Sequence, residues 1–228
     1  MRDKGLAGQD LVRPSTLSSL AKESIRMRIV TGEIVAGEIY SAPALAAVLG
    51  VSATPVREAM LELTADGLVE AVPNRGFRVV ELSPHDLDEI FEIRLMLEVP
   101  AAQESARRGI SDADRDRFLE LAELIEKRAQ DGDMVGFLAA DRDFHLGLLA
   151  TLGNSRLVEI VSRLRDQARL YGLPMLAQRG QLRESAREHR EMLEAICRRD
   201  AAGVASVTTH HLEHTRGIWA GIAESANL

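Results

Sequence analysis

The spacing of apolar positions along the chain changes near residue 83, and this change predicts two parts. After residue 83, apolar residues recur at roughly every third or fourth position over long stretches, which is typical of amphipathic helices. Glycine, asparagine, aspartate or proline interrupts these stretches. The interruptions predict helices over 84–109, 112–131, 134–152, 154–176, 179–199 and 201–225. We therefore expect residues 83–228 to form an all-helical bundle.

The first part follows a different pattern. Helical spacing is found over 15–32, 43–50 and about 55–66, and two short apolar runs, 68–72 and 77–80, flank a turn at 73–76. Three helices followed by a hairpin is the order of a winged helix-turn-helix. The predicted fold class is thus mainly α, with an N-terminal winged helix-turn-helix over 15–82 and a C-terminal all-helical bundle. Residues 1–14 are expected to form a flexible N-terminal tail.

Composition narrows the class of protein. Hydrophobic residues make up 46% of the chain and aromatic residues only 4%, which favours helices with a sizeable core. The single cysteine, Cys197, suits a reducing cytoplasm, and no run approaches the roughly 20 apolar residues that span a bilayer. We expect a cytoplasmic protein with no membrane partner.

Charge restricts where a nucleic acid could bind. The net charge is −7, yet residues 1–82 hold nine Lys and Arg against ten Asp and Glu, a balance of −1, which leaves −6 for residues 83–228. A DNA-binding surface must therefore be a local patch in the first part.

The best candidate for that patch is the start of the third expected helix, Thr54-Pro55-Val56-Arg57. Thr54 is predicted to be the N-cap, with Ser52 as a rival, and Pro55 would then be the first helical residue. Hydroxyl groups and Arg57 at a helix N-terminus suit phosphates and guanine edges. The alternative is a capped core helix whose Arg57 is an ordinary surface residue, and these residues alone leave both possibilities open.

A family resemblance favours the first possibility. The stretch GVSATPVREAMLELTADGLVEAVPNRGFRVV is similar to the winged helix-turn-helix of GntR-family bacterial regulators. The resemblance covers about residues 15–82 and implies a homodimer on palindromic operator DNA. It also implies DNA contacts from both elements. The helix would contribute Ser52, Thr54 and Arg57, and the wing would contribute Arg75 and Gly76. Ala53 and Pro43 stand where the family often has basic residues, which reduces the expected number of contacts.

In the second part, inward-facing stripes carry polar residues. Asp141 and His145, four residues apart, share the apolar face of 134–152, and His189 and His211 lie on the apolar stripes of two later helices. Three imidazoles and a carboxylate suit zinc, nickel or manganese. Hydrogen-bonded core histidines and a plain Asp141–His145 ion pair are the alternatives. His214 lies only about 60° from His211 around its helix and rivals it as a ligand.

A second resemblance bears on these residues. Four segments, EIRLMLEVPAAQESA, AADRDFHLGLLATLGN, EHREMLEAICRRDAAG and HHLEH, look like the FCD effector-binding domain of the FadR subfamily, over about residues 84–222. In its metal-binding members an Asp-x-x-x-His pair and two later histidines hold a divalent ion, which implies Asp141, His145, His189 and His211 as ligands. Zinc is the first expectation, and about six helices suggest the VanR-like variant.

Two further residues are candidates for binding an effector. Arg94 is on the inward stripe of 84–109, where a buried guanidinium needs an anion. It either pairs with Glu98 or, as the resemblance implies, holds the carboxylate of a small organic acid. Asn154 matches a family position near the pocket, although it could equally be a left-handed residue that ends a helix.

These observations predict a ligand-responsive bacterial transcriptional regulator, not an enzyme, that binds a divalent metal and a small organic acid. One rival is a metal-dependent hydrolase, for which the nearest candidate base is Asp143. The other is a regulator whose metal is purely structural.

Overall fold

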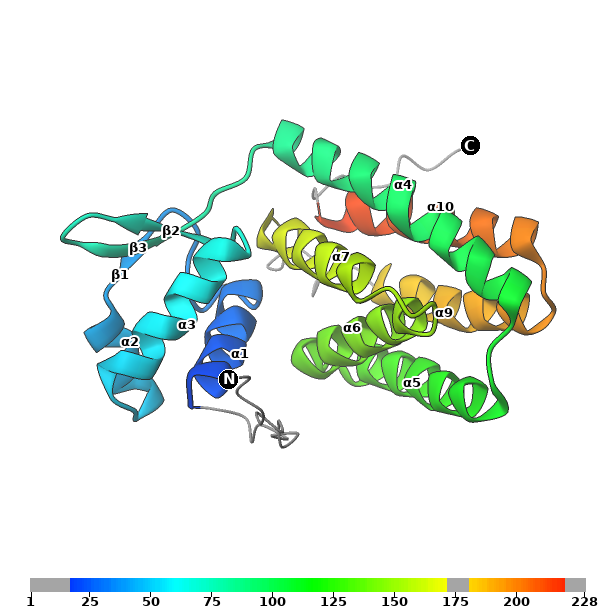
Figure 1. Ribbon diagram of the computed structural model, residues 1–228, viewed down its shortest axis with the longest axis horizontal. Coiled ribbons are helices and arrows are strands. Elements are labelled where there is room, and N and C mark those ends of the chain that lie inside the picture. Colours follow the sequence, from blue (N-terminus) through cyan, green and yellow to red (C-terminus); the bar gives the residue numbers. More distant parts are fainter. Residues whose placement is uncertain (1–16, 172–180, 220–228) are drawn as a thin grey trace, which may run out of the picture.

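The protein has two lobes joined by a short connection, residues 80–83. The computed structural model describes residues 17–171 and 181–219, so the predicted tail 1–14 lies outside the described residues. The small sheet and the first three helices form one lobe, and long helices form the other (Figure 1). The predicted fold class, mainly α with a winged helix-turn-helix before a helical bundle, is confirmed.

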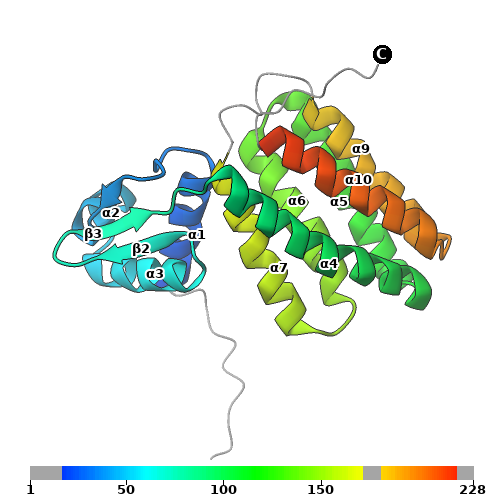
Figure 2. The same cartoon turned by 90° about the horizontal axis from the view of Figure 1, so that it is seen from above.

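The N-terminal lobe contains three helices and a three-stranded antiparallel sheet of order β1-β3-β2. Its elements are α1 (Leu17–Val30), β1 (Ile39–Tyr40), α2 (Ala42–Leu49), α3 (Ala53–Ala65), β2 (Val69–Val72) and β3 (Gly76–Val79). The predicted hairpin is β2–β3, and it lies at the end of this lobe away from the helical lobe (Figure 2). The sequence did not reveal β1, because two residues are too few to show an alternating pattern.

The start of α3 differs from the prediction. Ser52 occupies the N-cap position without a side-chain capping hydrogen bond, and Ala53 is the first helical residue. The prediction that Thr54 caps the helix is therefore wrong, and Pro55 is the third helical residue. A proline is tolerated there because the first four N–H groups of a helix have no intrahelical acceptor. Thr54 is left exposed on the first turn.

Gly76 shows why the wing needs a glycine at this point. Its φ is +133°, which L residues with a side chain rarely adopt. A Cβ atom there would lie 2.4 Å from the backbone oxygen of Tyr40, at the neighbouring strand β1. Gly76 therefore has a structural role whether or not it also approaches DNA.

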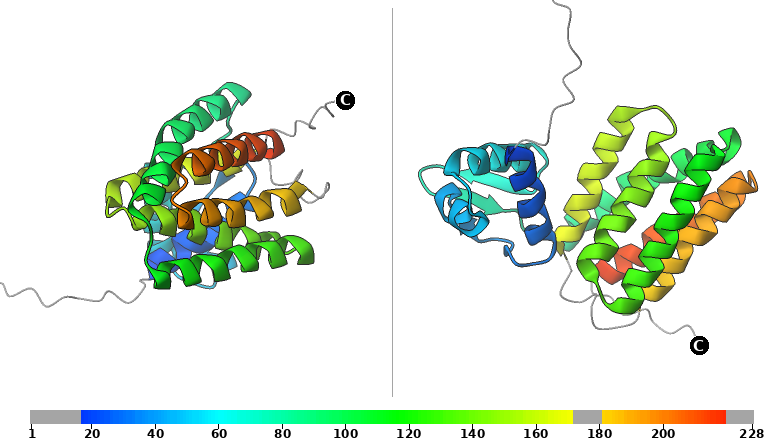
Figure 3. Two further views of the ribbon diagram at one scale, coloured as in Figure 1. Left: turned by 90° about the vertical axis from the view of Figure 1, so that its right-hand side faces the viewer. Right: turned by 90° about the horizontal axis from the view of Figure 1, so that it is seen from below.

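The helical lobe is a closed ring. Six α-helices lie in its described part: α4 (Pro84–Arg108), α5 (Asp112–Asp131), α6 (Met134–Ala150), α7 (Ser155–Ala168), α9 (Gln181–Cys197) and α10 (Ala201–Trp219). Neighbours pack in the order α4, α10, α9, α5, α6, α7 and back to α4 (Figure 3). The predicted helix 154–176 is shorter than expected, since α7 passes into a 3-10 turn, η1 (Arg169–Tyr171).

The residues around position 83 explain where α4, the first helix of the ring, begins. Ser83 and Asp86 form a capping box, in which Ser83 Oγ accepts from Asp86 N at 3.2 Å and Asp86 Oδ2 accepts from Ser83 N at 2.8 Å. Pro84 follows as the first helical residue. The chain therefore changes from the wing to a 25-residue helix within a few residues.

The centre of the ring is unusual because it is both buried and polar. Phe118 and Phe144 pack edge to face at 5.8 Å within an apolar core. Beside that core lie charged residues and histidines whose exposed fraction, taken over the whole residue, is at most 6%: Arg94, Glu98, Asp141, His145, Arg165, Arg169, Glu188, His189 and His211. Charged groups are rarely buried without partners or ligands, so this polar centre is the candidate functional site of the helical lobe.

The two lobes meet along α7 and η1. Asp166 accepts a hydrogen bond from Arg26 of α1 at 2.8 Å, and Gln167 Nε2 donates to the backbone oxygen of Asp66 at 2.9 Å. Leu170 packs against the core of the N-terminal lobe. The same short segment therefore borders the polar centre on one side and the winged lobe on the other.

One finding concerns membranes. Among the described residues no single helix is long and apolar enough to cross a bilayer, and only α2 and α3 taken together, bent by 114°, pass that test.

Candidate metal centre and nucleic-acid interface

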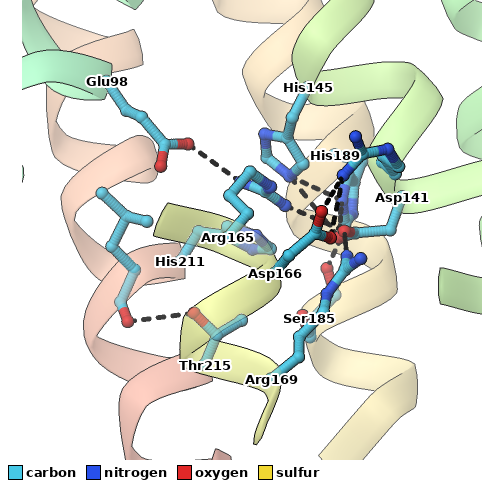
Figure 4. A network of polar contacts seen from close by, with 12 residues as sticks. Glu98, Asp141, His145, Arg165, Asp166, Arg169, Ser185, His189, His211 and Thr215 are labelled. Carbon is cyan, nitrogen blue, oxygen red and sulfur yellow. Dashed lines mark hydrogen bonds and ion pairs between the residues drawn. The ribbon is translucent and has the colours of Figure 1, made fainter. Parts of the chain in front are cut away.

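Four predicted ligands meet at the centre of the ring. Asp141 and His145 come from α6, His189 from α9 and His211 from α10, and all four are buried. One potential ligand atom from each lies within 4.8 Å of the other three. Figure 4 shows Asp141, His145 and His189 converging on one point between the helices.

The separations fit ligands of a single ion. Nε2 of His145 lies 3.0 Å from Nε2 of His189, and Oδ1 of Asp141 lies 3.2 Å from Nε2 of His189 and 3.6 Å from Nε2 of His145. Ligand bonds of about 2.1 Å place neighbouring ligand atoms roughly 3 to 3.5 Å apart. Three nitrogens and one carboxylate oxygen are donors that zinc, nickel and manganese accept.

Hydrogen bonds on the far side of two imidazoles set their tautomers. Nδ1 of His189 lies 3.0 Å from the carbonyl oxygen of Ser185, and Nδ1 of His211 lies 2.6 Å from Oε2 of Glu188. Both partners are acceptors, so Nδ1 carries the proton and Nε2 presents a lone pair to the centre. Glu188 was not predicted as a site residue; its place directly before His189 was the available signal.

The charge states also suit a cation. Burial, together with the nearby guanidinium of Arg165, holds the pKa of His145 well below its usual value, and burial lowers the pKa of His211 to about 4. Burial alone would raise the pKa of Asp141, but Arg165 and Arg169 outweigh it and hold that pKa well below its usual value. Neutral imidazoles beside an ionised carboxylate are the ligand forms that bind metals.

One atom of the cluster has its hydrogen-bonding capacity unused. Among the described residues, Nε2 of His211 is buried and has no hydrogen-bond partner. A buried polar atom without a partner costs about 1 to 3 kcal/mol. An ion shared with His145 and His189 would give this nitrogen its partner, so the residues fit a divalent metal.

The structure also distinguishes His211 from His214, the two rival ligands that the helical spacing left open. His214 is not grouped with Asp141, His145 and His189, and its Nδ1 lies 2.7 Å from Oε1 of Glu188. His211, in contrast, has its ring centroid 4.9 Å from that of His145 and 4.8 Å from that of His189. The geometry therefore favours His211 as the fourth ligand.

Asp141 is also held by arginines that the sequence analysis missed. Oδ2 of Asp141 accepts from Arg165 at 2.8 Å and from Arg169, while Oδ1 points to the imidazoles (Figure 4). Arg165 also donates to Glu98 at 2.9 Å. Two arginines four residues apart near the end of α7 were the signal that could have revealed them.

Arg94 lies at the same centre. Its Nε donates to Oε1 of Glu98 at 2.7 Å, which is the pairing that the sequence left as one alternative. Arg94, Arg165 and Arg169 together line a cavity of about 20 Å³ that Asp141 also borders. That volume holds about one water molecule.

Asn154 is not brought to this cavity. It is exposed at the N-cap of α7, where its Oδ1 accepts from the backbone N–H of Leu157 at 3.1 Å. Its φ of −106° is also not left-handed, so the alternative that it ends a helix in that conformation is wrong; Gly153 has that conformation. Asp143, the candidate base of the hydrolase hypothesis, is exposed and does not face the cluster.

In the N-terminal lobe, three of the five predicted DNA contacts line one groove. Arg57 of α3 and Arg75 of the wing turn both border a groove of about 480 Å³, together with Gly76. Both arginines are exposed, and neither forms an ion pair with any other described side chain. Ser52 and Thr54 are exposed at the N-terminus of α3 but are not among the residues that line this groove. Exposed donors without acid partners are available to phosphates and base edges.

Comparison with known families matches both lobes. Residues 17–79 match the family described as "Bacterial regulatory proteins, gntR family", and residues 89–214 match the FCD domain. The FCD match alone covers more than half of the chain.

Individual relatives agree with these matches. The probable D-xylose utilization operon transcriptional repressor of Paenarthrobacter nicotinovorans is 31% identical over 198 residues, covering 87% of this chain and 86% of its own. The gluconate operon transcriptional repressor of Bacillus licheniformis is 28% identical over 186 residues, or 81% and 74% of the two chains. The solved structure of E. coli McbR/YncC has a TM-score of 0.80 at 26% identity and covers 90% of this chain and 97% of its own.

Proposed function

Because the chain belongs to the gntR family of bacterial regulatory proteins with an FCD domain, and is thus a DNA-binding transcriptional regulator, we propose that it is controlled by a small organic acid. The acid would bind beside a divalent metal ion, with zinc as the first expectation. The observation that carries this proposal is the convergence of Asp141, His145, His189 and His211 next to a cavity lined by three arginines.

The charge balance of the cavity favours an acid. Three guanidinium groups, those of Arg94, Arg165 and Arg169, face two carboxylates, those of Glu98 and Asp141, which leaves one positive charge. Burial lowers the pKa of Arg169 to about 10, so this guanidinium is still charged at neutral pH. A carboxylate would neutralise the excess and make charge-assisted hydrogen bonds. A bound ion would supply a Lewis acid that holds a carboxylate oxygen.

The small size of the cavity indicates that binding of an acid would require a conformational change. A cavity of about 20 Å³ is much smaller than the roughly 300 to 1,000 Å³ of typical ligand pockets. An organic acid would therefore have to displace side chains, and Arg165 and Arg169 on α7 and η1 are the ones that hold Asp141. The acid thus favours a conformer in which this segment has moved.

The contacts of α7 indicate how this conformational change would affect the winged lobe. Arg165 and Arg169 face the cavity, whereas Asp166 binds Arg26 of the winged lobe at 2.8 Å and Gln167 binds the backbone of Asp66 at 2.9 Å. A shift of α7 would change how the winged lobe is held. Operator affinity would change by at most the ratio of the acid's affinities for the two conformers.

We include homodimerisation in the proposal, since a palindromic operator requires two winged lobes. Ile93 and Met96 of α4 are 44% and 70% exposed, which supports the outer side of this helix as part of the dimer surface.

The proposal is tested by measuring operator affinity with and without its ligands. Protein stripped with a chelator and protein reloaded with zinc would be titrated with a fluorescent operator fragment. A panel of short carboxylic acids would then be added, beginning with gluconate because one relative is named for a gluconate operon. We expect an acid to change operator affinity in the zinc-loaded protein. If zinc raises thermal stability but no acid has any effect, the metal is structural and the effector proposal fails.

The assigned DNA surface predicts a loss of affinity in the variant Arg57→Ala. Losing a phosphate or guanine contact costs about 1 to 3 kcal/mol, or roughly 5- to 150-fold in the dissociation constant. Fluorescence anisotropy at several salt concentrations would measure it, with a salt slope reduced by about one if the contact is to phosphate. Arg198→Ala, which removes an exposed arginine of the other lobe, is the matched control and should bind normally. Equal affinity of the two variants would contradict the recognition helix.

A further inference from the structure

A second group of metal-binding side chains lies on the outer side of the Asp141 cluster. It consists of Glu188 on α9 and of His210 and His214 on α10, and one potential ligand atom from each lies within 4.8 Å of the others. We propose that Glu188, His210 and His214 form a second divalent-cation site, distinct from the site at Asp141.

The arrangement follows from the helices. His210 and His214 are four residues apart, so both project from the same side of α10, and their ring centroids are 5.8 Å apart. Glu188 reaches them from the neighbouring helix α9. Its Oε1 lies 2.7 Å from Nδ1 of His214 and 3.4 Å from Nε2 of His210.

The ligand set suits borderline transition ions. Two imidazoles and one carboxylate are a combination that zinc accepts while keeping a position for water. Both oxygens of this carboxylate already face imidazole nitrogens: Oε2 lies 2.6 Å from Nδ1 of His211 and Oε1 lies 2.7 Å from Nδ1 of His214. A cation would find one negative charge and two aromatic nitrogens within reach.

Access distinguishes this site from the first one. The side chain of His210 is 67% exposed, whereas those of Glu188 and His214 are 7% and 3% exposed. A cation can therefore reach the group from solvent without the helical ring opening. The four residues of the Asp141 cluster are all buried, so that cluster lacks such a route in this conformer.

Glu188 would link the two sites. Its Oε1 faces His210 and His214, while its Oε2 accepts from Nδ1 of His211 at 2.6 Å. A cation on Oε1 draws electron density from the carboxylate and weakens the acceptor that orients His211. Occupation of the outer site is thus expected to reduce metal affinity at the inner site.

Counting bound metal tests the inference. Full-length protein, stripped with a chelator, would be dialysed against zinc and analysed for metal per chain. We expect two equivalents in the unmodified protein and one in the variant His210→Ala. His210 is exposed, so its loss should not unfold the lobe. Ser206→Ala, an exposed change one turn earlier on α10, is the matched control and should keep both equivalents.

The variant His189→Ala separates this inference from the proposed function. If the inner site does not bind metal, the unmodified protein will hold one equivalent, which His210→Ala removes and His189→Ala leaves in place; the outer site then stands alone. If His210→Ala holds as much zinc as the unmodified protein, the three side chains only solvate a buried carboxylate and the outer site is refuted.

Discussion

Replacing His189 with alanine is expected to lower the affinity of the inner site for zinc by about 100- to 1,000-fold. Structural zinc sites with four ligands bind with about 10 to 16 kcal/mol, so one ligand accounts for roughly a quarter of that free energy. His189 is fully buried, its Nε2 lies close to both Asp141 and His145, and its Nδ1 is already fixed by the carbonyl of Ser185. Within residues 17–171 and 181–219, no further metal-binding side chain is grouped with Asp141, His145 and His211.

The measurement is a competition between the protein and a chromophoric zinc chelator. His85→Ala is the matched control, because it removes an imidazole that is 80% exposed and lies on α4, away from the cluster. Normal affinity is expected in that control. If His189→Ala competes for zinc at the inner site as well as the control does, these four side chains do not form a metal site.

Replacing Arg165 with methionine is expected to destabilise the helical lobe by about 3 kcal/mol, at the lower end of the cost of breaking a buried ion pair. Arg165 is 4% exposed and joins Glu98 on α4 to Asp141 on α6, at 2.9 and 2.8 Å. Without it, each carboxylate keeps one cationic partner, Arg94 or Arg169, and loses the other. The methionine fills similar volume, so the loss is electrostatic.

Urea denaturation of the metal-free protein, followed by helical circular dichroism, would measure this change. Arg163→Met is the control on the same helix. Arg163 is 46% exposed and its pair with Asp66 at 3.2 Å is worth at most about 1 kcal/mol. A loss below about 1 kcal/mol in Arg165→Met would show that Arg94 and Arg169 suffice to stabilise both carboxylates.

The family explains what the protein is, and the arrangement of α7 suggests how its lobes communicate. The pocket arginines and the contacts to the winged lobe alternate within the six residues from Arg165 to Leu170. A helix that is packed on two sides has little freedom to adjust on one side only. A displacement of Arg165 at Asp141 is therefore expected to alter the contact between Asp166 and Arg26 as well.

Much of this fold could be read from the sequence because its signals are local. Helical periodicity and the capping residues at Ser83 and Gly132 give the helices of the second lobe, and the turn at 73–76 gives the wing. The errors were local as well. Thr54 and Ser52 are both good caps, and a preference of a few tenths of a kcal/mol between them is too small to predict.

The inner cluster was predictable in its members but not in its geometry. By itself the sequence determined that Asp141, His145, His189 and His211 lie on inward stripes, because about 3.6 residues per turn decides which face of a helix a residue occupies. Only the tertiary structure decided that these faces meet, that His211 and not His214 completes the cluster, and that Arg165 and Arg169 hold Asp141. Periodicity assigns a side chain to a face, whereas the packing of helices far apart in sequence chooses its neighbours.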